Sequence, residues 1–157
     1  PALADNAMLS AQHGGDFRKN PNCLGKNVSP PLAWSHPPEK TRSYVLLMDD
    51  QAGRGGLGVN HAVLYGIPAT IAAFAEGELG APAKGGRFVA GKNTLGIPYL
   101  GPCPPRGNAP QHYVFTLIAT DVDPAALPAG LTKDEVLKAL GGGKALRAAS
   151  LVFRYAH

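Results

Sequence analysis

The stretch that decides the fold is Gly101-Pro102-Cys103-Pro104-Pro105-Arg106-Gly107, which runs almost directly into a predicted strand at residues 113–120. Its prolines fix φ and remove backbone donors, while the flanking glycines permit conformations that are closed to other residues. A segment preset in this way can hold backbone N–H groups and small side chains in one arrangement, as a shallow binding pocket requires. A stiff surface turn is the alternative interpretation, because Pro and Gly are also ordinary loop residues.

Length and composition predict one β-rich domain. The chain has 157 residues, about the size of a single domain, and we expect residues 1–157 to form one. Its 20 glycines and 15 prolines are typical of short strands joined by turns, as in a β-sandwich or barrel. The 15 basic and 11 acidic residues are scattered and give a net charge of +4, so a nucleic-acid partner is not expected. The apolar stretches are too short for a transmembrane segment.

Two strands are predicted on either side of a glycine-rich segment. Residues 44–48 are continuously apolar and are followed by Asp49 and Asp50, which is typical of a strand buried on both faces that ends at the surface. A second strand is predicted from His61 to residue 67. Between them, residues 53–58 contain four glycines and are expected to form a mobile loop. Acidic side chains at the end of the first strand are well placed to face a ligand.

The C-terminal part carries a helix start signal. Thr132 and Glu135 have the spacing of a reciprocal capping box, which predicts that a helix begins after Thr132. We expect another turn or two of helix at residues 144–149 and a last short strand at residues 151–155.

The two cysteines leave two interpretations open. The sequence begins at Pro1, so we expect that an N-terminal segment was removed, by processing or by cloning. If a secretory signal was cleaved, the protein is periplasmic or secreted, and Cys23 and Cys103 can pair in a loop of about 80 residues that is worth about 4 kcal/mol. Two free thiols, as in a cytoplasmic protein, are the alternative. The cysteines lack the paired spacing of a zinc site, and no metal or cofactor is expected.

Several separate blocks resemble the phosphatidylethanolamine-binding protein family, also called the Raf kinase inhibitor-like family, in its bacterial branch. Asn27-Val28-Ser29-Pro30-Pro31-Leu32-Ala33-Trp34 is similar to the family's Asn-x-Ser-Pro-x-Leu-x-Trp block. Residues 61–68 resemble its histidine-led strand that ends in Ile-Pro-Ala, and residues 101–107 resemble its Gly-Pro-x-Pro-Pro-x-Gly signature. The blocks occur in the family's order and cover about residues 23–121.

The resemblance implies a mainly β fold, a Greek-key β-sandwich with a few short helices that are chiefly C-terminal. It also implies a small pocket at one end that accepts the anionic part of phosphate-bearing head groups or phosphorylated ligands. Matched residue by residue, the pocket set is Asp49, His61, Gly101, Cys103, Pro104, Pro105 and Tyr113.

The chain departs from the family pattern beside the first aspartate. The family usually reads Asp-Pro-Asp-Ala-Pro, whereas this chain has Asp49-Asp50-Gln51-Ala52-Gly53, so the second carboxylate is matched to the neutral Gln51. A common pocket Trp, two residues before the histidine, is Val59.

A further departure follows the proline tract. The family's His-x-Tyr is matched to Gln111-His112-Tyr113. Because residues two apart in a strand share a face, we expect Gln111 and Tyr113 to face the pocket and His112 to point away. A bulge near Pro110 would exchange the two faces and bring His112 inward.

The expected pocket is a set of hydrogen-bond donors with one carboxylate. His61, Gln111 and Tyr113 can donate to an anion. Asp49 opposes a dianion unless it keeps His61 protonated, accepts a proton from the ligand or meets an ammonium group. Phosphate-type ligands are therefore expected to bind more tightly as the pH falls through the titration of His61.

Other interpretations stay open at this point. His61 and Tyr113 also suit purely structural roles in a core. A hydrolase with His61 as base and Cys103 as nucleophile is disfavoured, because neither cysteine lies in a nucleophile motif, and we expect no enzymatic activity. Relatives of the family include inhibitors of kinases and serine proteases, so inhibition through residues 53–58 or 75–92 is the alternative function.

Overall fold

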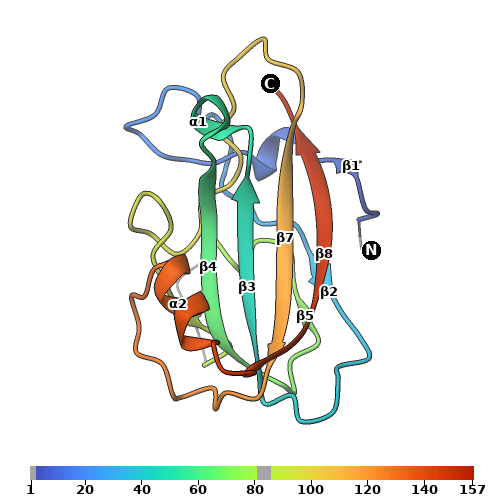
Figure 1. Cartoon of the computed structure of the whole chain (residues 1–157). Helices are drawn as coiled ribbons and strands as arrows, with labels where there is room; N and C mark the ends of the chain where they lie inside the picture. The colour runs from blue at the N-terminus through green and yellow to red at the C-terminus, as the bar shows by residue number, and fades with distance from the viewer. Residues whose placement is uncertain (1–2, 81–85) are drawn as a thin grey trace.

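Six strands form one sheet in the computed structural model, which describes residues 3–80 and 86–157 (Figure 1). Their order is β1 (Ala7–Met8), β8 (Ala145–Tyr155), β7 (Gln111–Thr120), β3 (Ser43–Asp50), β4 (Val59–Pro68) and β6 (Val89–Ala90). A separate two-stranded sheet consists of β2 (Leu32–Ala33) and β5 (Ala73–Phe74). The helical segments are a 3₁₀ turn (Ala11–His13), α1 (Gly53–Gly56) and α2 (Lys133–Ala139). The prediction of a mainly β fold with a few short helices is confirmed, whereas the Greek-key sandwich stays a prediction.

The central strand β3 pairs antiparallel with β4 on one side and β7 on the other. Seven of its eight residues are buried, which explains why its sequence is continuously apolar rather than alternating. Strand β4 is also largely buried and covers the segment predicted from His61. The two carboxylates that end β3 lie at the same end of the sheet as α1 and the start of β7, at the top of Figure 1.

The two faces of the sheet pack against different layers. On one face, Tyr44, Leu46 and Met48 belong to a core that includes Leu32 of β2 and Phe74 of β5. On the other face, alternate residues of β3 and β4 pack with Val136 and Leu140, at α2 and its end. This division follows from the two-residue period of a strand, which sends neighbouring side chains to opposite faces.

Helix α2 begins where its sequence predicts. The Thr132 side chain accepts a hydrogen bond from the Glu135 amide, and the Glu135 carboxylate accepts one from the Thr132 amide, so the capping box is confirmed. The prediction of a helical turn at residues 144–149 was wrong. These residues form the first half of β8, which pairs with β7 from Ala145 onward, because cross-strand pairing outweighs the helix propensity of an Ala-rich segment. Among the described residues, no helix has the length and apolar character needed to cross a membrane.

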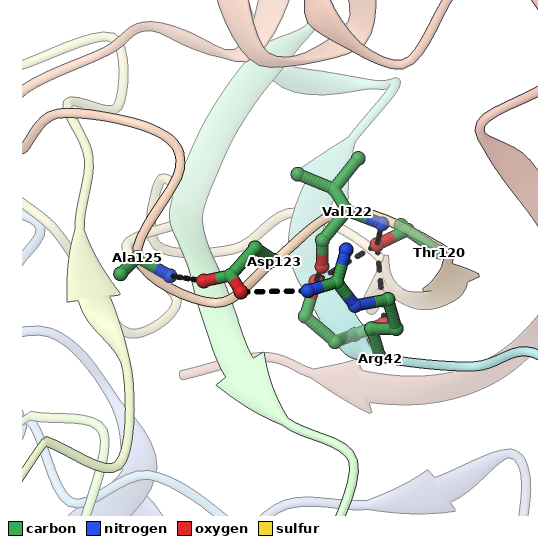
Figure 2. A network of polar contacts seen from close by, with 6 residues as sticks. Arg42, Thr120, Val122, Asp123 and Ala125 are labelled. Carbon is green, nitrogen blue, oxygen red and sulfur yellow. Dashed lines mark hydrogen bonds and ion pairs between the residues drawn. The ribbon is translucent and has the colours of Figure 1, made fainter.

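A polar network closes the end of the sheet opposite α1 (Figure 2). The Arg42 guanidinium donates to the Asp123 carboxylate at 2.7 Å, and the Ser43 hydroxyl lies 2.8 Å from the Thr120 hydroxyl. The Ser43 hydroxyl also donates to the Val122 carbonyl at 2.8 Å. The start of β3 and the end of β7 are therefore tied to the loop that follows β7. The cavity described below lies at the other end of these two strands.

A disulfide joins Cys23 to Cys103 across 80 residues of sequence. The paired interpretation of the cysteines therefore holds, and neither is a free thiol. The bond attaches the N-terminal loop that carries Cys23 to the proline tract.

Replacing both cysteines with serine is expected to lower the free energy of unfolding by about 4 kcal/mol, because the bond closes a long loop in the unfolded chain. Urea unfolding of the double variant measures the change, and wild-type protein unfolded with reductant should give a matching curve. A double variant within about 1 kcal/mol of oxidised wild type would contradict the expectation.

Candidate functional site

A cavity of about 460 Å³ opens at the end of the sheet where β3 finishes and β4 and β7 begin. Five structural segments contribute to its wall, namely the loop before Cys23, the α1 turn, the loop that carries Leu95, the proline tract and the strand ends. The lining residues with polar side chains are Asn20, Asn22, Asp50, Arg54, His61, Thr94, Asn108, Gln111 and Tyr113.

Asp50 supplies the carboxylate of this cavity. It is the last residue of β3 and lies directly opposite Tyr113 of β7, so the two side chains share a face. The residue is only 3% exposed, and its carboxylate Oδ1 accepts hydrogen bonds from the Ala52 and Gly53 amides at 3.0 and 3.1 Å. Burial raises the pKa of Asp50 above its ordinary value, and the nearby His61 opposes the rise.

Asp49, which was expected to face the pocket, does not line this cavity. Asp49 precedes Asp50 by one residue, so its side chain lies on the opposite face of the sheet. There it contacts the Lys133 ammonium and the Asn60 amide, each at 3.0 Å, beside a separate hollow of about 280 Å³. Gln51, which was matched to the second carboxylate, also lines that other hollow rather than the cavity.

His61 reaches the cavity because of an irregularity in β4. Met48 pairs with Ala62 and Asp49 pairs with Asn60, so His61 is an extra residue with no partner on β3. Such a bulge turns two successive side chains toward one face. The alternation along β4 is therefore broken at His61, which brings its side chain to the same face of the sheet as Asp50.

The imidazole of His61 is held in one orientation. Its Nδ1 lies 2.9 Å from the Leu100 carbonyl, which can only accept, so Nδ1 carries the proton and the neutral ring has an unprotonated Nε2. The ring packs edge-on against Tyr113 with a centroid separation of 5.3 Å. The residue is 5% exposed, and burial lowers the pKa of His61 despite the neighbouring Asp50.

Tyr113 and Gln111 lie side by side in the cavity, as predicted, whereas His112 is exposed. The Tyr113 hydroxyl donates to Gln111 Oε1 at 3.4 Å. Burial raises the pKa of Tyr113 far above its ordinary value, and Asp50 adds to the rise. Tyr113 is therefore a neutral donor at physiological pH, and β7 follows regular alternation without a bulge at Pro110.

The proline tract contributes only part of what was predicted. Cys103 and Pro105 line the cavity, whereas Gly101 and Pro104 do not. The Gly101 amide donates to the Asn27 side chain at 2.7 Å, so it is not available to a ligand. The tract also accepts a hydrogen bond at Pro102 from the Gly15 amide, which anchors it to the N-terminal segment. Gly101 and Pro104 thus shape and hold the wall without facing the cavity.

Several polar lining side chains besides Asp50 were missed by the sequence reasoning, among them Arg54, Thr94 and three asparagines. Arg54 is the one cationic side chain among the described lining residues, and it projects from a backbone with positive φ. The sequence could have pointed to Arg54, because it is the one charged residue in the glycine-rich segment at residues 53–58. Asn20 and Asn22 are distant in sequence from the other lining residues, whereas Asn108 lies between Pro105 and Gln111. The Cys23–Cys103 bond explains the first two, since it fixes their loop beside the proline tract.

The arrangement combines donors with two buried acceptors. Arg54, Tyr113 and the amide of Gln111 can donate to an anion. Asp50 and the neutral His61 offer a carboxylate oxygen and a ring nitrogen that accept. Among residues 3–80 and 86–157, no group of three or more His, Cys, Asp and Glu side chains is arranged to hold a metal ion.

Comparisons with known proteins agree on one family. A family model described as phosphatidylethanolamine-binding protein matches residues 1–156. The chain is 35% identical over 155 residues to a protein of Aquifex aeolicus named "UPF0098 protein", covering 98% of this chain and 89% of that protein. It is 35% identical over 140 residues to "Putative lipoprotein LppC" of Mycobacterium tuberculosis, covering 89% of this chain and 62% of that protein.

Two crystal structures have the same fold. YbcL of Escherichia coli, described as a new member of the mammalian PEBP family, superposes with a TM-score of 0.84 at 25% identity, covering 99% of this chain and 94% of YbcL. CT736 of Chlamydia trachomatis, described as a homologue of phosphatidylethanolamine-binding protein, superposes with a TM-score of 0.79 at 28% identity, with the same coverage of each chain.

The buried carboxylate predicts an unusual response to mutation. A folded-state pKa above the ordinary 3.8 means that Asp50 stabilises the fold fully below pH 3.8, and that this stability is lost as the pH rises through the raised pKa. Asp50→Asn removes the buried charge, so the variant should melt about 2–4 °C above wild type at pH 7 and at the same temperature at pH 3.5. Thermal unfolding by circular dichroism measures both differences.

Asp49→Asn is the matched control for this substitution. It removes an ion pair with Lys133 on the other face, so it should not raise the melting temperature at pH 7. Destabilisation of Asp50→Asn at pH 7 would contradict the account of a carboxylate penalised by burial.

Proposed function

Since the chain belongs to the phosphatidylethanolamine-binding protein family, we propose that it is a non-catalytic binding protein whose cavity holds a phosphate-bearing or other anionic group. One observation carries the proposal: the side chains of Asp50, His61 and Tyr113 come from three adjacent strands and meet on the floor of one cavity. Titratable groups with perturbed pKa values that converge in a concave site are a candidate binding or active site.

The donors in this cavity suit an anion. Arg54 brings a guanidinium, which matches the geometry of phosphate and carboxylate oxygens, and it stands on a glycine-rich turn that can adjust to a ligand. Tyr113 and Gln111 add neutral donors deeper in the cavity. Each hydrogen bond to a charged group contributes about 1.5–3 kcal/mol, so a small head group or phosphorylated ligand can be held by a few of them.

The state of Cys103 supports binding rather than hydrolysis. It lines the same cavity as His61, but its sulfur is bonded to Cys23. A sulfur in a disulfide lacks the thiolate needed for attack on a substrate carbonyl or phosphoryl group. The floor of the cavity accordingly supplies recognition without a nucleophile at this position.

The same disulfide supports an extracytoplasmic location, which we include in the proposal. Disulfides of this kind persist in oxidising compartments such as the periplasm or the cell exterior. One relative, from Mycobacterium tuberculosis, carries the word lipoprotein in its name.

Removal of His61 should weaken the binding of inorganic phosphate about tenfold or more at pH 6. Burial lowers the pKa of His61, so the ring is largely neutral at pH 6.5 and above. At lower pH a bound anion favours the imidazolium, and affinity rises as the pH falls below 6.5. Isothermal titration calorimetry of wild type and His61→Ala between pH 5 and 8 measures the difference.

His112→Ala is the control, because this neighbouring histidine is exposed and lies outside the cavity. Phosphate changes its own ionisation equally for every variant, so the difference between the two variants isolates His61. Equal affinity of His61→Ala and His112→Ala across the whole range would remove His61 from the site.

Protein inhibition is a second candidate, and Leu57 is the observation that favours it. Leu57 is 81% exposed and stands between glycines of positive φ at the tip of the α1 turn. A large apolar side chain in such a position can enter a pocket on a partner. The other segment considered from the sequence, residues 75–92, includes residues 81–85, which lie outside the described part of the chain.

If inhibition through Leu57 is the function, stoichiometric inhibition of a serine protease or kinase should fall about tenfold or more in Leu57→Ser and persist in His61→Ala. Titration against a panel of purified enzymes measures both variants. Inhibition that Leu57→Ser leaves intact would rule out this loop as the contact.

A further inference from the structure

The floor of the cavity presents an acceptor that no group of the protein satisfies. Oδ1 of Asp50 takes both backbone hydrogen bonds from the α1 turn, and no hydrogen bond to Oδ2 is found among the described residues. Asp50 as a residue is 3% exposed, and because it lines the cavity, its Oδ2 can be reached by a molecule that enters there. A ligand that enters the floor therefore meets a carboxylate oxygen that needs a proton donor.

His61 presents a second acceptor that needs a hydrogen-bond donor from the ligand. His61 commits its Nδ1 proton to the Leu100 carbonyl, which leaves Nε2 of the neutral ring as an acceptor. The donors lie beside these acceptors, because Tyr113 is the direct cross-strand partner of Asp50 and packs edge-on against His61. Both side chains lie on one face of the sheet and line the same cavity, so a ligand in the cavity can contact the Tyr113 hydroxyl and the Asp50 carboxylate.

We propose that Asp50 is a specificity-determining residue, and that the cavity selects phosphate groups that carry a P–OH, such as phosphomonoester monoanions, over tetrahedral anions that carry no proton. The inference rests on the proposed function of the cavity as an anion site. In the complex, the P–OH donates to Asp50 Oδ2, while Tyr113, Gln111 and Arg54 donate to the other phosphate oxygens.

The chemistry of the competing anions sets the selectivity. A phosphomonoester has a second pKa of about 6, so its protonated monoanion is available near neutral pH. Sulfate and phosphodiesters carry no such proton and would place a lone pair against the Asp50 carboxylate. A charged group that faces an acceptor in a buried site is disfavoured strongly, whereas one that donates to it is stabilised.

The proton shared between Asp50 and the phosphate comes from the ligand, because the charged and titratable groups around Asp50 do not readily supply one. His61 of β4 and Tyr113 of β7 face it from the two neighbouring strands, Arg54 lies on the turn that follows β3, and the exposed His112 acts from further away. The tyrosine hydroxyl stays un-ionised and the guanidinium stays charged. His61 is the one alternative carrier of the proton, and a dianion that binds above the second phosphate pKa must take up a proton from solvent.

Calorimetry with three small anions tests the selectivity at pH 6.5. Wild type should bind inorganic phosphate about 10- to 100-fold more tightly than sulfate or dimethyl phosphate. In Asp50→Asn, the amide can donate where the carboxylate accepted, so sulfate should gain affinity, phosphate should lose it and the preference should fall to near unity. The matched variant Asp49→Asn changes the neighbouring carboxylate on the other face and should keep the wild-type preference.

A measurement on unmodified protein keeps the inference testable if Asp50→Asn does not fold. At pH 8, phosphate binding followed in two buffers of different ionisation enthalpy should show uptake of about one proton per phosphate bound. Uptake that disappears in His61→Ala would place the proton on His61 and overturn the role of Asp50.

The outcomes separate this inference from the function it rests on. Equal binding of phosphate and sulfate by wild type would overturn the selectivity of Asp50 while leaving the anion cavity in place. Tight binding of glycerophosphoethanolamine, a diester with an ammonium group, that Asp50→Asn abolishes would show that an ammonium rather than a P–OH meets the carboxylate. Failure of wild type to bind any of these anions at millimolar concentration would overturn the proposed function itself.

Discussion

The site depends on how β3 is paired on its two sides. With β7 it keeps an unbroken register, which places Asp50 opposite Tyr113, whereas with β4 the register slips by one residue between Met48 and Asp49. The slip leaves His61 without a partner and turns it toward the face that Asp50 occupies. Without this extra residue, strict alternation along β4 would separate the imidazole from the carboxylate, and the cavity would contain one without the other.

The central strands were predictable because their sequences are dictated by burial on both faces. The helix start at Thr132 was predictable for a different reason, since a capping box is a local contact between residues three apart. The placement of Gln111 and Tyr113 was predictable from the match to the family's His-x-Tyr together with strand alternation, because β7 is regular beside the prolines. The polar network at the far end, by contrast, joins Arg42 to Asp123 over a sequence separation that no local pattern reveals.

The errors have physical causes that lie outside local sequence patterns. Asp49 was matched to the family's pocket aspartate, but its neighbour Asp50 lines the cavity, and in a strand a shift of one residue exchanges the faces. With Asp50 in that place, the second carboxylate position falls on Ala52, which does line the cavity. Residues 144–149 have the composition of a helix, but β8 pairs with β7 from Ala145 onward. Asn20 and Asn22 line the cavity because the disulfide at Cys23 holds their loop beside the proline tract. Long-range pairing and covalent attachment decided these positions.

The two walls of the cavity differ in how firmly they are held. The proline tract is held by the restricted φ angles of its prolines, by the disulfide to Cys23 and by hydrogen bonds to Gly15 and Asn27. The facing wall is the α1 turn, where Arg54, Gly55, Gly56 and Gly58 all have positive φ. The glycine turn is therefore the wall that can change shape more easily, and a ligand of the proposed site would enter and leave on that side, past a proline wall that keeps its form.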